Sequence, residues 1–127
     1  MTRRIDVRFR SDERLWRRFD VRGLTREEKL DDASLRLQIS VFREAFARRD
    51  DVPQGKWNGI AETTAGEAAS LSHGAVSIVC VDDPHPGSDG HALLAIVAKP
   101  GSIVSRDDVE KLRRKLATSM RVVVLPT

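Results

Sequence analysis

The sequence contains a single cysteine, Cys80, and no tyrosine. One cysteine excludes an intrachain disulfide and fits a reducing compartment. Because Cys80 lies inside the apolar run 75–81, we expect a buried, inert thiol rather than a nucleophile. With no tyrosine and only four phenylalanines, the chain lacks the aromatic strand motif of RRM-type RNA-binding domains.

Long apolar runs are also missing. No run approaches the ~20 residues that span a bilayer, and the charged start of the chain (residues 1–18) has no apolar core of a signal peptide. These absences predict a cytoplasmic protein without a membrane partner. The chain also lacks GxGxxG, GxxxxGK[ST] and HExxH, so neither a phosphate-binding loop nor a cofactor is predicted.

The chain has 127 residues, of which 40% are hydrophobic and 32% charged. This composition is typical of a folded globular protein. The length favours one domain over residues 1–127, large enough to fold without a disulfide or a metal.

Basic residues are concentrated near the N-terminus. Residues 1–30 hold ten Arg/Lys and six Asp/Glu, a net charge of +4, whereas the other 97 residues have a net charge of −1. This asymmetry predicts a surface for nucleic acid or an acidic partner, or else only a solvated surface. Trp16 and Phe19 lie among these residues and are expected in the core. The candidate binding residues are Arg4, Arg8, Arg10, Arg14, Arg17 and Arg18.

Two elements are expected in the first half of the chain. Residues 5–9 alternate between apolar and charged, which predicts a strand with one buried face. Thr25 and Glu28 form a capping-box pattern that predicts a helix over 26–49. Two apolar arcs on this helix would cover roughly two-thirds of its circumference, more than a simple surface helix needs. Its cover would come from self-association, from a protein partner, or from residues 11–22 and 57–71. The arcs comprise Ala33, Leu37, Val41 and Ala45, and Leu35, Ile39, Phe42 and Phe46.

The second half predicts a short helix over 64–72, strands over 75–81, 91–99 and 121–125, and a helix over 105–118. The first two strands should pair as an antiparallel hairpin. Their nearly continuous apolar runs favour burial on both faces, by helices or by sheet stacking in a dimer. The succession β-α-(α)-β-β-α-β predicts an α+β fold (or an α/β sandwich), ferredoxin-like with an enlarged first crossover.

Residues 82–90 form a connection of nine residues, longer than most hairpin loops. Its histidines and carboxylates suit acid–base chemistry or a first-row metal ion, although its prolines and glycines also suit a plain turn. His73 is a further candidate, with a helix-end residue as the alternative. The catalytic candidates are His73, His85, His91 and Asp83, and the metal-ligand candidates are Asp82, His85, Asp89 and His91.

The sequence therefore predicts a small non-catalytic binding module, oligomeric or part of a complex. Its contacts would use helix 26–49 and the basic N-terminal face. The alternative is a small hydrolase or nuclease that uses the loop 82–91 with a divalent metal ion.

Overall fold

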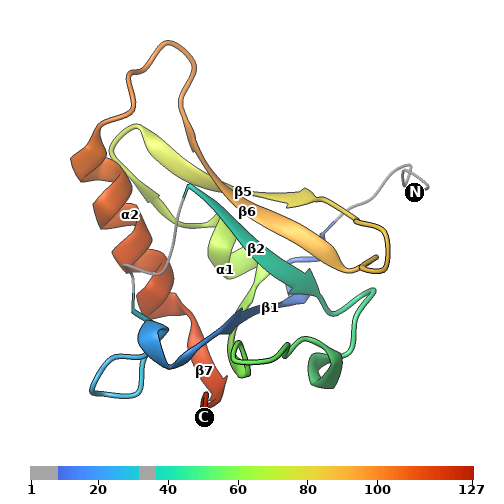
Figure 1. Ribbon diagram of the computed structural model, residues 1–127. Helices are drawn as coiled ribbons and strands as arrows, with labels where there is room; N and C mark the ends of the chain where they lie inside the picture. The colour runs from blue at the N-terminus through green and yellow to red at the C-terminus, as the bar shows by residue number, and fades with distance from the viewer. Residues whose placement is uncertain (1–8, 32–36) are drawn as a thin grey trace.

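A computed structural model describes residues 9–31 and 37–127. Within these residues, seven strands form one antiparallel sheet in the order β4-β5-β6-β2-β1-β3-β7. The sheet is curled, and the long helix α2 lies against it (Figure 1). In chain order the elements are β1 (Arg14–Phe19), η1 (Val21–Gly23), β2 (Gln38–Arg43), η3 (Arg49–Asp51), β3 (Gly59–Thr64), α1 (Ala65–Ala69), β4 (Ser72–His73), β5 (Val76–Asp82), β6 (His91–Ala98), α2 (Arg106–Ser119) and β7 (Arg121–Val124).

The predicted ferredoxin-like α+β (or α/β sandwich) fold is therefore wrong. Every strand pair in the described sheet is antiparallel, and α2 is the only α-helix of more than five residues among the described elements. The first crossover contains no long helix in its described part. The strand predicted over 5–9 lies almost entirely outside the described residues.

The helix predicted over 26–49 is replaced by a turn and a strand. The Thr25 hydroxyl accepts a hydrogen bond from the Lys29 amide at 3.1 Å, but this bond closes a turn and caps no helix. Glu28 has a φ of +60°, which a continuing right-handed helix does not allow. The chain instead turns back, and Leu24 pairs with Leu30 in an isolated bridge. The described residues of 26–49 therefore form no helix that could carry the predicted partner surface.

Strand β2 explains why the apolar arcs were misleading. Ile39, Val41 and Arg43 point inward and are buried, whereas Gln38, Ser40 and Phe42 point to the other face. The apolar–polar alternation typical of a strand is hidden in the sequence, because the inward residues include the charged Arg43 and the outward residues include the apolar Phe42. When a strand has apolar residues on both faces, the same residues also cover most of a helical wheel and suggest a helix. The β-branched residues Ile39 and Val41 favour the strand.

The main core lies between the concave face of the sheet and the helices. Val109, Leu112 and Leu116 of α2 pack with inward residues of the central strands, including Leu15 and Leu94. Trp16 and Phe19 are buried as predicted. Trp16 belongs to a second, smaller cluster on the opposite face, with Val52 and Ile60.

The predictions for the second half are confirmed at the level of elements. β5 and β6 pair antiparallel from Val76↔Ala98 to Asp82↔Ala92. The Thr64 hydroxyl caps α1 by accepting from the Glu67 amide at 3.1 Å. β7, however, does not join β6 in a βαβ unit, because it pairs with β3 at the far edge of the sheet. Among the described residues, no helix is long and apolar enough to cross a membrane.

The prediction that the hairpin strands are buried on both faces is wrong. Val76, Ile78 and Leu94 face the core, but Val79, Val81 and Val97 point away and are 43%, 42% and 39% exposed. Together with Leu93 and Ala95, which are partly exposed, these valines form what we call the outer face of the β5–β6 hairpin. The sheet thus leaves an apolar surface open.

Candidate functional site

The tip of the β5–β6 hairpin brings three of the predicted site residues together. One Asp83 carboxylate oxygen (Oδ2) lies 2.8 Å from His85 Nε2 and 3.2 Å from His91 Nδ1. The two imidazole rings are 4.3 Å apart between centroids. We call these residues the Asp–His–His cluster. Its side chains carry the oxygen and nitrogen atoms that the sequence predicted for metal binding or acid–base chemistry.

Backbone hydrogen bonds hold the tip in shape. His85 and Ser88 exchange two backbone hydrogen bonds, of 3.0 and 2.8 Å, around a turn that contains Pro86 and Gly87. Gly87 has a φ of +76°, which glycine adopts without steric cost. The Asp83 amide donates to the His91 carbonyl at 3.1 Å and thereby extends the ladder. The nine-residue loop is therefore a short ordered extension of the hairpin.

His91 is the most buried member of the cluster. Its side chain is 13% exposed, against 38% for Asp83 and 53% for His85. Its ring makes a T-shaped contact with Phe42 of β2, with centroids 5.8 Å apart and an interplanar angle of 81°. Nδ1 also lies 2.9 Å from the backbone carbonyl oxygen of Asp83. These contacts fix the orientation of the ring.

Asp82, a predicted metal ligand, has a different role. Its carboxylate lies 3.1 Å from Arg43 Nη1, and Arg43 also makes a two-pronged contact with Glu13 at 2.8 and 2.9 Å. The guanidinium carbon lies 3.9 Å from the centre of the Phe9 ring and 4.9 Å from that of Phe46. Arg43 is 1% exposed, so this is a buried ion-pair network.

The charge of Arg43 is maintained inside the protein. Burial alone disfavours the guanidinium and acts to lower its pKa. The hydrogen bonds to Glu13 and Asp82 outweigh burial, so that the pKa of Arg43 is raised above its usual value. This network joins β2, β5 and the residue that precedes β1, and it is structural.

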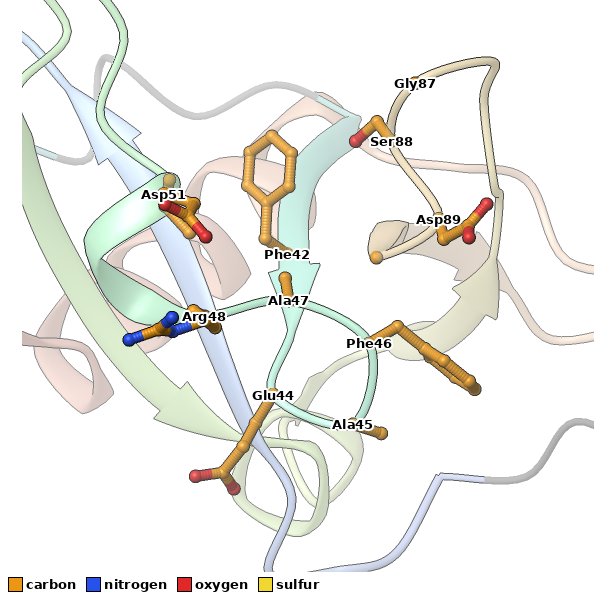
Figure 2. Close-up of a pocket in the computed structure, with 12 residues that line it drawn as sticks. Phe42, Glu44, Ala45, Phe46, Ala47, Arg48, Asp51, Gly87, Ser88 and Asp89 are labelled. Atoms are coloured by element: carbon orange, nitrogen blue, oxygen red, sulfur yellow. The ribbon is translucent and has the colours of Figure 1, made fainter.

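Asp89, the other predicted ligand, does not join the cluster. It lines a pocket of about 580 Å³ between the hairpin tip and the segment 44–52 that follows β2. Figure 2 shows Phe42 between that segment and the tip residues Ser88 and Asp89. Arg48, Asp51 and Glu44 supply further charge to its walls. No member of the Asp–His–His cluster lines this pocket.

His73 and Cys80 stand apart from the cluster. His73 Nε2 lies 3.9 Å from Asp108 of α2, so the two predicted histidine sites do not converge. The Cys80 thiol is partly buried and points at the Ala65 carbonyl, with Sγ 3.8 Å from the oxygen. Burial raises the pKa of Cys80 to about 11, which supports the predicted inert thiol.

The described arginines of the predicted basic face do not form one patch. Arg10 pairs with Asp12 at 3.3 Å, and Arg14 lies 3.9 Å from Glu44. Arg17, on the concave side, donates to the Ser40 carbonyl. Arg18, on the other side, stacks on Phe42 and donates to the Val52 carbonyl. Arg4 and Arg8 lie outside the described residues.

The inward position of Arg43, the pocket and the outer face escaped sequence reasoning. A charged residue between apolar neighbours normally points to water, and no local signal marks Arg43 as buried. The pocket joins two loops that are distant in the chain, 44–52 and 87–90, and its shape depends on the pairing of β2 with β6. The apolar runs 75–81 and 91–99 do indicate the outer face, but they equally fit strands that are buried on both faces, which is the interpretation that the sequence favours.

Comparison with protein-family models, with curated proteins and with solved structures gave no significant match to this chain.

Proposed function

We propose that this protein is an interaction module that associates with a second copy of itself through the outer face of the β5–β6 hairpin. One observation carries the proposal. Val79, Val81 and Val97 are about 40% exposed on adjacent strands of an ordered sheet, on the side away from the core. Contiguous exposed apolar surface of this kind is typical of protein–protein contacts.

The charge on this face favours a second copy as the partner. Its outward positions on β5 and β6, from Ser77 to Val81 and from Leu93 to Val97, are all uncharged, so two copies meet without repulsion. Asp83 lies at one end of the face and Lys99 directly follows β6 at the other end. If the two-fold axis lies between the stacked sheets and perpendicular to the strands, the strands of one copy run opposite to those of the other. Each Lys99 then approaches the Asp83 end of the opposite copy.

The geometry is that of two stacked sheets. Sheets that pack face to face lie about 10 Å apart, and their side chains interdigitate. The outward side chains here are serine, alanine, valine and leucine, all uncharged and compact enough for such packing. Because the outer face is formed by only two strands, β5 and β6, we expect the interface to be small. Interfaces below about 1,200 Å² are those of weak or transient complexes.

Sedimentation velocity over about 10–500 µM protein tests the proposal, with EDTA present so that metal ions cannot link the copies. We expect the mean sedimentation coefficient to rise with concentration, and Val79→Lys or Val97→Lys to remain monomeric. Val123→Lys is the matched control, because Val123 is 36% exposed on β7 at the opposite edge of the sheet. A wild-type chain that stays monomeric throughout, or equal loss of association in the control, contradicts the proposal.

Other functions have less support. The scattered pairing of Arg10, Arg14, Arg17 and Arg18 gives nucleic acid no continuous basic track among the described residues. The hydrolase or nuclease alternative needs its reactive groups in a concave site. The Asp–His–His cluster does converge, but the pocket beside it is lined by other residues. We therefore place the interaction module first.

A further inference from the structure

We propose that Asp83, His85 and His91 form a binding site for a divalent transition-metal ion, with Zn²⁺ the best fit. The observation is geometric: one potential ligand atom from each residue lies within 4.8 Å of the other two. In a tetrahedral zinc site with bonds of about 2.0–2.1 Å, ligand atoms lie roughly 3.3 Å apart. The Asp83 oxygen is 2.8 and 3.2 Å from the two histidine nitrogens, close to that spacing.

The ligand types decide which ions fit. Two imidazole nitrogens and one carboxylate oxygen suit Zn²⁺ and neighbouring first-row ions such as Co²⁺, Ni²⁺ and Cu²⁺. Ca²⁺ and Mg²⁺ require mostly oxygen ligands, and only Asp83 provides one from its side chain here. The site therefore selects transition metals over the alkaline-earth ions.

The scaffold holds the ligands before any ion binds. Asp83 and His91 are paired across the hairpin, and the His85–Ser88 bonds close the turn that carries His85. Phe42 supports the His91 ring from β2. Each ligand is thus only a few residues from paired backbone. A site on such a frame loses less conformational entropy on binding than one on a free loop.

In the observed geometry, His91 would bind the ion through Nδ1. Its Nδ1 atom faces the Asp83 carboxylate and also lies 2.9 Å from the Asp83 carbonyl oxygen. Coordination through Nδ1 requires its proton, where present, to move to Nε2, and the contact with the carbonyl is given up. The protonated Nε2 is then free to donate a hydrogen bond to an outer partner.

Three protein ligands leave one tetrahedral position for water. Structural zinc sites usually have four protein ligands, whereas sites with three keep an exchangeable position. The exposure of His85 and Asp83, 53% and 38%, leaves the cluster open to solvent. We therefore expect reversible binding, without a role for the ion in holding the fold together.

Isothermal titration of the full chain with Zn²⁺ tests the site. The chain must carry no histidine tag, and the buffer no chelator. We expect one ion per chain, and a loss of affinity of roughly tenfold or more in His85→Ala and in His91→Ala. His73→Ala is the matched control, because this histidine lies beside Asp108 and away from the hairpin tip. We expect the control to bind like the wild type.

A second readout separates ligand loss from misfolding. Co²⁺ in a four-coordinate site gives visible absorption bands, which we expect in the wild type and in His73→Ala but not in Asp83→Asn. Far-UV circular dichroism should remain unchanged in all variants, because His85 and Asp83 are partly exposed. No Zn²⁺ binding at 1 mM overturns the proposal, and so does binding that His85→Ala and His91→Ala leave intact.

Discussion

At the residue scale, Arg43 is the most deeply buried charged side chain among the described residues. Its guanidinium contacts two phenylalanine rings and pairs with Glu13 and Asp82, with almost no contact with water. A buried charge is tolerated only when its partners replace the lost hydration. The converse also holds, because removal of the cation leaves two carboxylates that are largely withdrawn from solvent.

We therefore expect Arg43→Met to lower the free energy of unfolding by about 3–5 kcal/mol. Methionine retains much of the apolar bulk beside Phe9 and Phe46 but cannot pair with Glu13. Urea unfolding followed by circular dichroism measures the change. Arg14→Met is the control, since the Arg14–Glu44 pair is exposed and long at 3.9 Å, and exposed pairs contribute less than about 1 kcal/mol. Equal effects of the two substitutions would show that burial of Arg43 is not the cause.

The partner carboxylate provides an internal check on that experiment. If the cost in Arg43→Met comes from unpaired carboxylates, adding Glu13→Gln should restore part of the stability, because the amide is neutral. A double variant that is less stable than Arg43→Met would instead assign the cost to lost packing against Phe9 and Phe46.

At the element scale, helix α1 is short and its position depends on one close approach. The Gly66 amide donates to the Ser11 carbonyl at 2.8 Å. A Cβ atom added at Gly66 would lie 2.8 Å from that same oxygen, which belongs to the backbone and cannot rotate away. This contact joins α1 to the segment before β1.

Gly66→Ala should consequently lower the stability by about 1–3 kcal/mol, the range for inserting an atom into a packed site. Helix propensity alone predicts the opposite sign, because alanine exceeds glycine by about 1 kcal/mol within a helix. Ala69→Gly, at an exposed position of the same helix, should show that ordinary preference. Thermal unfolding of both variants measures the pair, and a stabilised Gly66→Ala would disprove the close approach.

The elements themselves show what the sequence could predict. The β5–β6 hairpin, α2 and the short helix α1 were predicted because each depends on residues close together in the chain. β2 was missed because it has apolar residues on both faces, and the capping-box pattern at Thr25 suggested a helix. Residues 38–43 form a strand because they pair with β1 and β6. Such pairing with distant segments cannot be predicted from the local sequence.

The same division holds for the candidate site. Asp83, His85 and His91 were predicted as candidates because they lie within nine residues, and a hairpin brings such residues together. The Arg43 network was not predicted, since Glu13 lies just before β1, Arg43 on β2 and Asp82 on β5, and only the fold of the sheet brings them together. Chemistry on one loop can thus be predicted from sequence, but chemistry between distant strands cannot.

At the scale of the whole molecule, long-range pairing dominates the architecture. Glu62 of β3 contacts Arg121, 59 residues further along the chain, and Trp16 donates to Glu62 across 46 residues. β7 joins the sheet only after the chain has passed along α2 to the far edge. Such contacts require large loops to close before they contribute stability, which slows folding.

We therefore expect refolding on the millisecond-to-second timescale at 25 °C, as in other proteins rich in non-local strand pairs. Trp16 can report it, because it is buried and its indole nitrogen donates to Glu62 at 2.9 Å. Trp57 is 44% exposed, so Trp57→Phe leaves Trp16 as the single tryptophan with little effect on the core. Stopped-flow fluorescence after dilution from urea measures the rate. Recovery of the full signal within about 1 ms would mean that Trp16 is buried by local structure, before β1 and β3 pair, and would contradict a sheet assembled by distant segments.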